Sequence, residues 1–157
     1  MSEARPIRVS YHWLRLRAVA HPTEDPAKVQ QALRFVSGLD EAGFQDAVRA
    51  TQLETHHGLP LTVFEAVLDR SRDLRAVLAR VFALPGALDR LRATLDARVD
   101  DDGILYLRVE KQAASLGELR LGEGEDAIQI RLKVEAYPAG RAAALERLRT
   151  MLESGRP

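Results

Sequence analysis

The 157-residue chain contains no cysteine and no asparagine, and it has no long apolar run. Without cysteine it cannot form disulfides or thiolate-ligated zinc and iron–sulfur sites. No apolar stretch approaches the roughly 18 residues that a membrane-spanning helix needs, and the first ten residues lack the apolar core of a secretory signal. We therefore expect a cytoplasmic protein that has no membrane partner.

The chain also lacks net charge, because 23 basic side chains balance 23 acidic ones. It is therefore not a uniformly basic nucleic-acid binder. The charges are nevertheless segregated: residues 70–98 carry seven Arg against three Asp, and residues 99–126 carry three basic against eight acidic side chains. Because salt limits electrostatic fields to about 8–10 Å, local patches matter more than the total.

Arginine dominates the basic residues, with 20 Arg against three Lys. Arginine suits the planar, bidentate recognition of phosphate. A biased genomic composition, or adaptation to heat through added ion pairs, would produce the same excess. Composition leaves these alternatives open, and the placement of the arginines has to separate them.

Length and composition favour one globular domain spanning residues 1–157, with an ordered core over about 6–154. Apolar periodicity predicts strands over 7–20, 46–55, 61–68, 104–110 and 128–135. Helices are expected after a cap at Thr23, after a cap at Ser71, from Pro85-Gly86 to near Val99, over 112–116, and from Arg141 to Gly155. This order, β-α-β-β-α-α-β-(α)-β-α, predicts an α+β fold with a mainly antiparallel sheet of about five strands and helices packed on one face.

If the other face of the sheet is open, strand alternation indicates which side chains it carries. On the last strand the apolar positions alternate with Gln129, Arg131 and Lys133, which therefore point outward. Rings and guanidinium groups on one wet face are typical of a platform for single-stranded RNA or RNA loops. Against this, any wet sheet face carries charges, and a lone Trp is often part of a core. The residues expected on this face to contact RNA are Tyr11, Trp13, Arg15, Arg17, Arg49, Tyr106, Arg108, Arg131 and Lys133.

Catalytic motifs are missing from the sequence. It has no GxSxG, no phosphate-binding GxxxxGK[ST] and no GxGxxG. A metal-dependent phosphodiesterase remains a lesser alternative, because imidazole and carboxylate groups suit zinc, manganese or iron. Its ligands would be drawn from His12, His21, His56 and His57 with Glu54 or Asp69, although no HxH or HExxH spacing occurs. We expect no enzyme, no catalytic residue, no metal and no cofactor.

Four segments have matching counterparts in one known family. They are Tyr-His-Trp-Leu-Arg-Leu-Arg-Ala at 11–18, His-Pro-Thr-Glu-Asp at 21–25, Glu-Thr-His-His-Gly-Leu-Pro at 54–60, and Lys-Gln-Ala-Ala at 111–114 followed by Leu-Gly at 116–117. In this order, over nearly the whole chain, they resemble a family of small archaeal proteins considered RNA-binding or exosome-associated. The most specific of them are the His-His-Gly turn and the Lys-Gln-x-Ala segment.

This resemblance implies a fold similar to that of the ribosomal protein that binds 5S rRNA, and a role near RNA processing. Together with the sheet face, it predicts a non-catalytic RNA-binding protein. Its expected partners are single-stranded or structured RNA, and exosome or other RNA-processing proteins. A second cluster of RNA contacts is expected at Arg49, His56, His57, Gly58, Lys111 and Gln112.

An alternative function is a structural or assembly module. Its apolar helix faces, or an exposed edge of the sheet, would pair with another protein or with a second copy of the chain. The zero net charge makes a homo-oligomer compatible with the composition.

Overall fold

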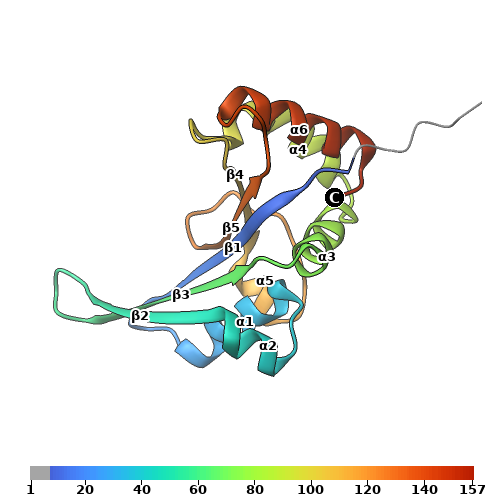
Figure 1. The fold of residues 1–157 in the computed structure, drawn as a ribbon. Helices are drawn as coiled ribbons and strands as arrows, with labels where there is room; N and C mark the ends of the chain where they lie inside the picture. Colours follow the sequence, from blue (N-terminus) through green and yellow to red (C-terminus); the bar gives the residue numbers. More distant parts are fainter. Residues whose placement is uncertain (1–7) are drawn as a thin grey trace, which may run out of the picture.

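The computed structural model describes residues 8–157, which form an α+β fold. Five strands make one sheet in the order β2-β3-β1-β5-β4, and every neighbouring pair is antiparallel (Figure 1). The expected fold class is confirmed. The strands are β1 (Tyr11–Ala20), β2 (Val48–Glu54), β3 (Pro60–Leu68), β4 (Leu105–Glu110) and β5 (Ala127–Val134).

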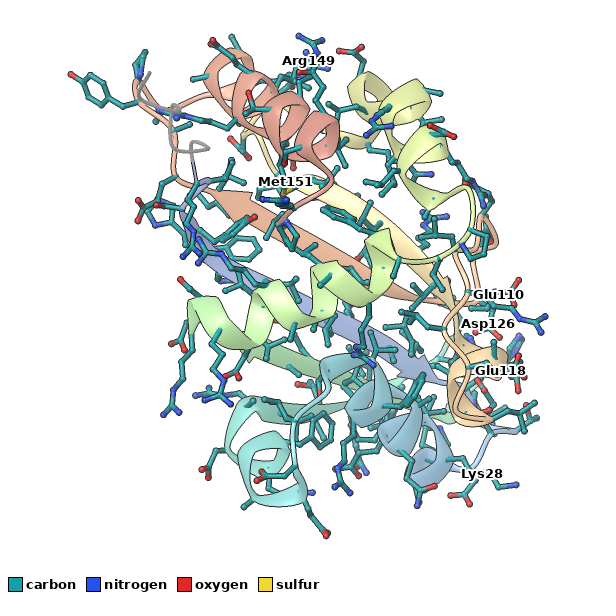
Figure 2. All side chains as sticks on the ribbon, turned by 90° about the vertical axis from the view of Figure 1, so that its right-hand side faces the viewer. Lys28, Glu110, Glu118, Asp126, Arg149 and Met151 are labelled. Carbon is teal, nitrogen blue, oxygen red and sulfur yellow. The ribbon has the colours of Figure 1, made fainter. Side chains whose placement is uncertain are left out.

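The helices gather on one side of this sheet (Figures 1 and 2). Helix α1 lies against α5 and against the central strands β1 and β3, while α4 and α6 pack together beside β4 and β5. The helices are α1 (Pro26–Ser37), α2 (Glu41–Ala47), α3 (Ser71–Phe82), α4 (Ala87–Arg98), α5 (Lys111–Ser115) and α6 (Arg141–Ser154).

The hydrophobic core fills the space between the helices and one face of the sheet. Alternate residues of each central strand enter it, so Leu14 and Leu16 of β1 and Ile130 and Leu132 of β5 have no exposed surface. Side chains at the intervening positions of these strands point the other way. The helices leave that second face uncovered, and any site built on the sheet lies there.

The hairpin formed by β2 and β3 extends beyond the helical layer (Figure 1). Consequently most of β2 is exposed on both faces. Gly58 adopts φ +72° in the connecting turn, a left-handed conformation that glycine accepts at no steric cost. The predicted turn between the second and third strands is confirmed.

One predicted strand boundary is wrong. The pattern indicates a strand from Asp46, but residues up to Ala47 belong to helix α2, and β2 begins at Val48. The side chain of Asp40 caps this helix by accepting a hydrogen bond from the Gly43 N–H at 2.7 Å, and Phe44 anchors it in the core. A single buried side chain in seven residues produces too little helical periodicity to be recognised.

Two predicted caps also differ from the structure. Asp25 rather than Thr23 caps α1, accepting from the Ala27 N–H at 3.0 Å, because Pro26 takes the first helical position. Ser71 is the first residue of α3 instead of its cap, which is Arg70. The expected start of β1 at Ile7 and of the ordered core at residue 6 lie outside the described residues.

Within residues 8–157 no helix is long and apolar enough to cross a membrane.

Candidate nucleic-acid interface

The uncovered face of the sheet is ordered into rows by the register of the strands. The first row crosses all five strands, because each of its members is the direct partner of the next: Arg49, Glu65, Arg17, Gln129 and Arg108. The second row crosses four strands through Val67, Arg15, Arg131 and Tyr106. Trp13 pairs with Lys133 beyond the second row. We call these eleven residues the open face.

The open face is strongly cationic. Six of its residues are basic, and Glu65 is its one acidic member. Within residues 8–157 none of these six cations lies within 4.0 Å of a carboxylate. Elsewhere arginines are neutralised, as where Arg98 and Arg90 both contact Glu123. The six basic residues are Arg15, Arg17, Arg49, Arg108, Arg131 and Lys133.

Arg15 and Arg131 occupy the centre of the open face, directly opposite each other on β1 and β5. The guanidinium of Arg15 lies 4.2 Å from the ring centroid of Trp13, and that of Arg131 lies 5.4 Å from the ring centroid of Tyr106. Such cation–π contacts contribute roughly 0.5–1 kcal/mol each at exposed sites. The Nε of Arg131 donates to Gln129 at 3.0 Å, whereas the buried Nε of Arg15 has no hydrogen-bond partner in the part of the chain that the structure describes. The pair therefore keeps unused hydrogen-bond donors on a half-buried surface.

Tyr106 is held in place at its hydroxyl end. Its Oη donates to Oδ2 of Asp100 at 3.0 Å, from the acidic turn before β4. Burial, followed by the hydrogen bond to Asp100 and the charge of that carboxylate, raises the pKa of Tyr106 above its ordinary value of 10.0. Tyr106 therefore stays neutral and fixed under Arg131 at physiological pH.

Tyr11 was expected on the open face, and this expectation is wrong. The register of β1 against β5 shifts between Tyr11 and Trp13, so Tyr11 points into the core with 6% of its surface exposed. Such an irregularity places two nearby residues on opposite faces, which strict alternation does not foresee. Its Oη donates to Sδ of Met151 at 3.2 Å, on the side of α6 that faces the sheet (Figure 2), and Arg75 lies over its ring at 5.3 Å. Burial raises the pKa of Tyr11 against the opposing influence of Arg75.

Lys111 was expected to contact RNA, but its side chain is 2% exposed. Its Nζ donates to the Val19 carbonyl at 3.0 Å, to Oε1 of Glu24 at 2.8 Å and to Oδ1 of Asp126 at 2.5 Å. An ammonium group has three donors, and all three are used here. Asp126, at the edge of the molecule in Figure 2, thus helps to hold Lys111, which joins the ends of β1 and β4 to the segment before β5.

The expected second cluster is not assembled. His56, His57 and Gly58 are exposed at the tip of the β2–β3 hairpin, far from α5, which begins with Lys111 and Gln112 (Figure 1). Gln112 is exposed beside α1 on the helical side. Of the six residues of this cluster, only Arg49 belongs to the open face.

The four histidines do not converge either. Within the described chain, the one group of three side chains with metal-ligand geometry is His21, Glu24 and Asp126, whose ligand atoms lie within 4.8 Å of one another. Lys111 already places a positive charge against both carboxylates of this group. His12 lies 3.9 Å from Glu135 instead, at the far end of β1. The geometry does not support the histidine site of a phosphodiesterase.

Strand alternation correctly placed Trp13, Arg15, Arg17, Arg49, Tyr106, Arg108, Arg131 and Lys133 on the same face. It did not select Glu65, Val67 and Gln129 as site residues. Their contribution depends on the register between strands, which joins residues far apart in the sequence. The sequence offers only the alternation within each strand. This alternation indicates the face of the sheet on which a side chain lies, but not its neighbours on adjacent strands.

Known proteins match this chain over nearly its full length, some in sequence and one in fold alone. An RNA-binding protein of Pyrococcus abyssi is 34% identical over 148 residues, which are 93% of this chain and 96% of that protein. A solved structure from Methanothermobacter thermautotrophicus, of a protein family of unknown function, is 35% identical, with a TM-score of 0.71 over 92% of this chain and 99% of that one. A protein of Sulfolobus solfataricus shares the fold, with 19% identity and a TM-score of 0.62 over 90% of this chain and 98% of that one.

A family model described as RNA binding matches residues 13–134. The match begins at Trp13 and ends with β5, so it includes every open-face residue. From this match and the relative in Pyrococcus, we conclude that the chain belongs to this RNA-binding family of archaeal proteins.

Proposed function

We propose that this protein binds RNA through the open face and catalyses no reaction on it. The observation that carries the proposal is that six cations from β2, β1, β5 and β4 converge on one surface of a chain with zero net charge, and that none of them has a carboxylate partner among residues 8–157. Phosphate oxygens are the ligands that would satisfy them. The family's description and the name of the Pyrococcus relative support the same function.

Electrostatics makes the placement of these cations significant. Because screening acts over about 8–10 Å, acidic loops elsewhere in the chain do not cancel a local basic surface at physiological salt. For each phosphate that the protein neutralises, the affinity for a single strand falls as the salt concentration rises, with a log–log slope of about −0.7. The slope per phosphate is steeper for duplexes. A face with six cations predicts a strong salt dependence.

The cellular role that we propose is that of an accessory factor in RNA processing, including association with the exosome, in the cytoplasm. The resemblance of the 54–60 and 111–117 segments to exosome-associated proteins supports this role. Purification of the tagged chain from its host after RNase treatment should retain RNA-processing subunits if the role includes direct protein contacts.

Trp13 provides a direct test, because it is the one tryptophan of the chain and belongs to the open face. Titration with RNA in about 50 mM salt should change Trp13 fluorescence in a saturable way, and the apparent affinity should fall as salt is raised. The same affinity should be obtained from fluorescence anisotropy of labelled RNA. Absence of binding to both structured and unpaired RNA at this salt concentration would contradict the proposed function.

A further inference from the structure

The two aromatic rings of the open face are already in contact with guanidinium groups. Arg15 lies over the ring of Trp13 at 4.2 Å, and Arg131 lies over that of Tyr106 at 5.4 Å. Tyr106 is further fixed by its hydrogen bond to Asp100. A base that stacked on either ring would have to displace an arginine or use the remaining ring face. The rings therefore position cations, which differs from a platform whose rings are free for unpaired bases.

The cations also spread over an area instead of following a line. Arg49, Arg17 and Arg108 occupy one row on β2, β1 and β4, and this row spans four strand spacings, or about 19 Å. Along β1, Arg15 lies two residues from Arg17, at about 7 Å. Trp13 lies four residues from Arg17, at about 14 Å, and its cross-strand partner Lys133 adds a cation at that level of the sheet. A single strand follows one path across such a surface, whereas a duplex presents two backbones side by side.

The central pair is suited to one shared phosphate. Arg15 and Arg131 are direct cross-strand partners, and neither has a carboxylate within 4.0 Å in the described chain. The guanidinium fork of each arginine can donate two parallel hydrogen bonds to phosphate oxygens. An anion between the two would relieve their mutual repulsion, which a neutral base edge would not do.

We propose that the open face binds the sugar–phosphate backbone of base-paired RNA, with Arg15 and Arg131 holding one phosphate between them. This inference rests on the proposed RNA-binding function and specifies its ligand. Duplex RNA is recognised through its shape, phosphates and 2′-hydroxyls, since side chains cannot reach the bases in its deep, narrow groove. A broad cationic face whose rings are in contact with arginines fits that mode of recognition.

The test compares a 16-base-pair RNA duplex with a 16-nucleotide oligouridine, which cannot pair with itself, in the same buffer. The duplex should bind at least tenfold more tightly. Arg15→Gln and Arg131→Gln should each weaken duplex binding at least fivefold, whereas Trp13→Phe should change it less than threefold. Thermal melts of each variant establish that it is folded, and Lys28→Gln, an exposed cation of α1 on the helical side (Figure 2), serves as the matched control.

The outcomes separate this inference from the function on which it rests. Equal or tighter binding of oligouridine, together with a tenfold loss on Trp13→Phe, would overturn the duplex inference and leave RNA binding in place. Binding of neither RNA would overturn both. Duplex preference with full sensitivity to Arg15→Gln and Arg131→Gln would support both.

Discussion

Arg15 of β1 and Arg131 of β5 are direct partners in an antiparallel ladder, with like charges facing each other at the centre of the sheet. Like charges in this position destabilise a sheet. For two unit charges about 6 Å apart, such a repulsion is roughly 1–3 kcal/mol, depending on how much water surrounds them. Each guanidinium lies over its own aromatic ring, Trp13 or Tyr106, which compensates for part of this repulsion.

This relationship predicts an unfavourable coupling in the free protein. In a double-mutant cycle with Arg15→Gln and Arg131→Gln, the double variant should be less stable than the two single effects predict when added. We expect a coupling of about 0.5–1 kcal/mol that shrinks as salt screens the charges. Urea unfolding at low and high salt measures it. Strict additivity at low salt would mean that the two arginines do not repel each other.

Lys111 should contribute to stability and not to RNA binding. Lys111→Met removes a buried ammonium and leaves Glu24 and Asp126 without their shared partner. Because Glu24 and Asp126 are 22% and 53% exposed, water recovers part of the loss, and we expect a destabilisation of about 2–3 kcal/mol. Thermal unfolding and RNA titration of the same variant provide the measurement. An unchanged melting temperature with weakened RNA binding would restore Lys111 as an RNA contact.

A side chain at Gly103 should destabilise the protein for two reasons, a left-handed backbone and a steric clash. The same substitution at Gly86 measures the first reason alone. A Cβ at Gly103 would lie 2.7 Å from the Cβ of Ala144 in α6, and the residue has φ +80°. Gly86 has φ +74°, but no atom of the described residues lies within 4 Å of a Cβ built there. Gly86→Ala should cost about 1 kcal/mol from the left-handed backbone alone, and Gly103→Ala about 1–3 kcal/mol more from the clash. Equal losses of unfolding free energy would show that α6 does not pack tightly on this turn.

The raised pKa of Tyr106 predicts a stability change at alkaline pH. Because the folded-state pKa lies above the ordinary value of 10.0, the stabilisation from neutral Tyr106 is fully present below pH 10 and is lost as pH rises through the folded-state pKa. The stability difference between the wild type and Tyr106→Phe should therefore be constant below pH 10 and shift against the wild type above it. Chemical unfolding at pH 8 and above pH 10 measures the difference. A difference that is the same in both ranges would contradict the Tyr106–Asp100 contact.

Local periodicity predicted most of the fold. The alternation in β1 and β5 and the glycines that end α1 and α6 are local features, so the sequence indicates them directly. Helix α2 was missed because one buried residue, Phe44, leaves almost no pattern. Tyr11 was assigned to the wrong face because the irregularity between Tyr11 and Trp13 reverses the in–out alternation of the β1 residues that precede it.

The candidate site was harder to predict than the fold. Alternation assigned arginines to a face, but the ladder register decides that Arg15 opposes Arg131 and that Glu65 lies between Arg17 and Arg49. The burial of Lys111 could not be predicted from the sequence either, because its partners Glu24 and Asp126 are 87 and 15 residues away in the chain. Sequence patterns indicate which side chains leave the core, whereas tertiary contacts determine which of them remain available.

Charge-matched variants test the central claim most directly, by measuring RNA affinity against salt. Arg17→Gln, Arg108→Gln and Arg131→Gln together remove three cations from the open face. Lys28→Gln, Arg72→Gln and Arg156→Gln remove three exposed cations from α1, α3 and the C-terminus, which lie on the helical side (Figure 1). We expect the open-face variant to bind RNA at least 30-fold more weakly, with its salt slope reduced by about 2–3, and the helical-side variant to stay within threefold of the wild type. Equal losses in both variants, or a larger loss in the helical-side variant, would contradict an RNA-binding role for the open face.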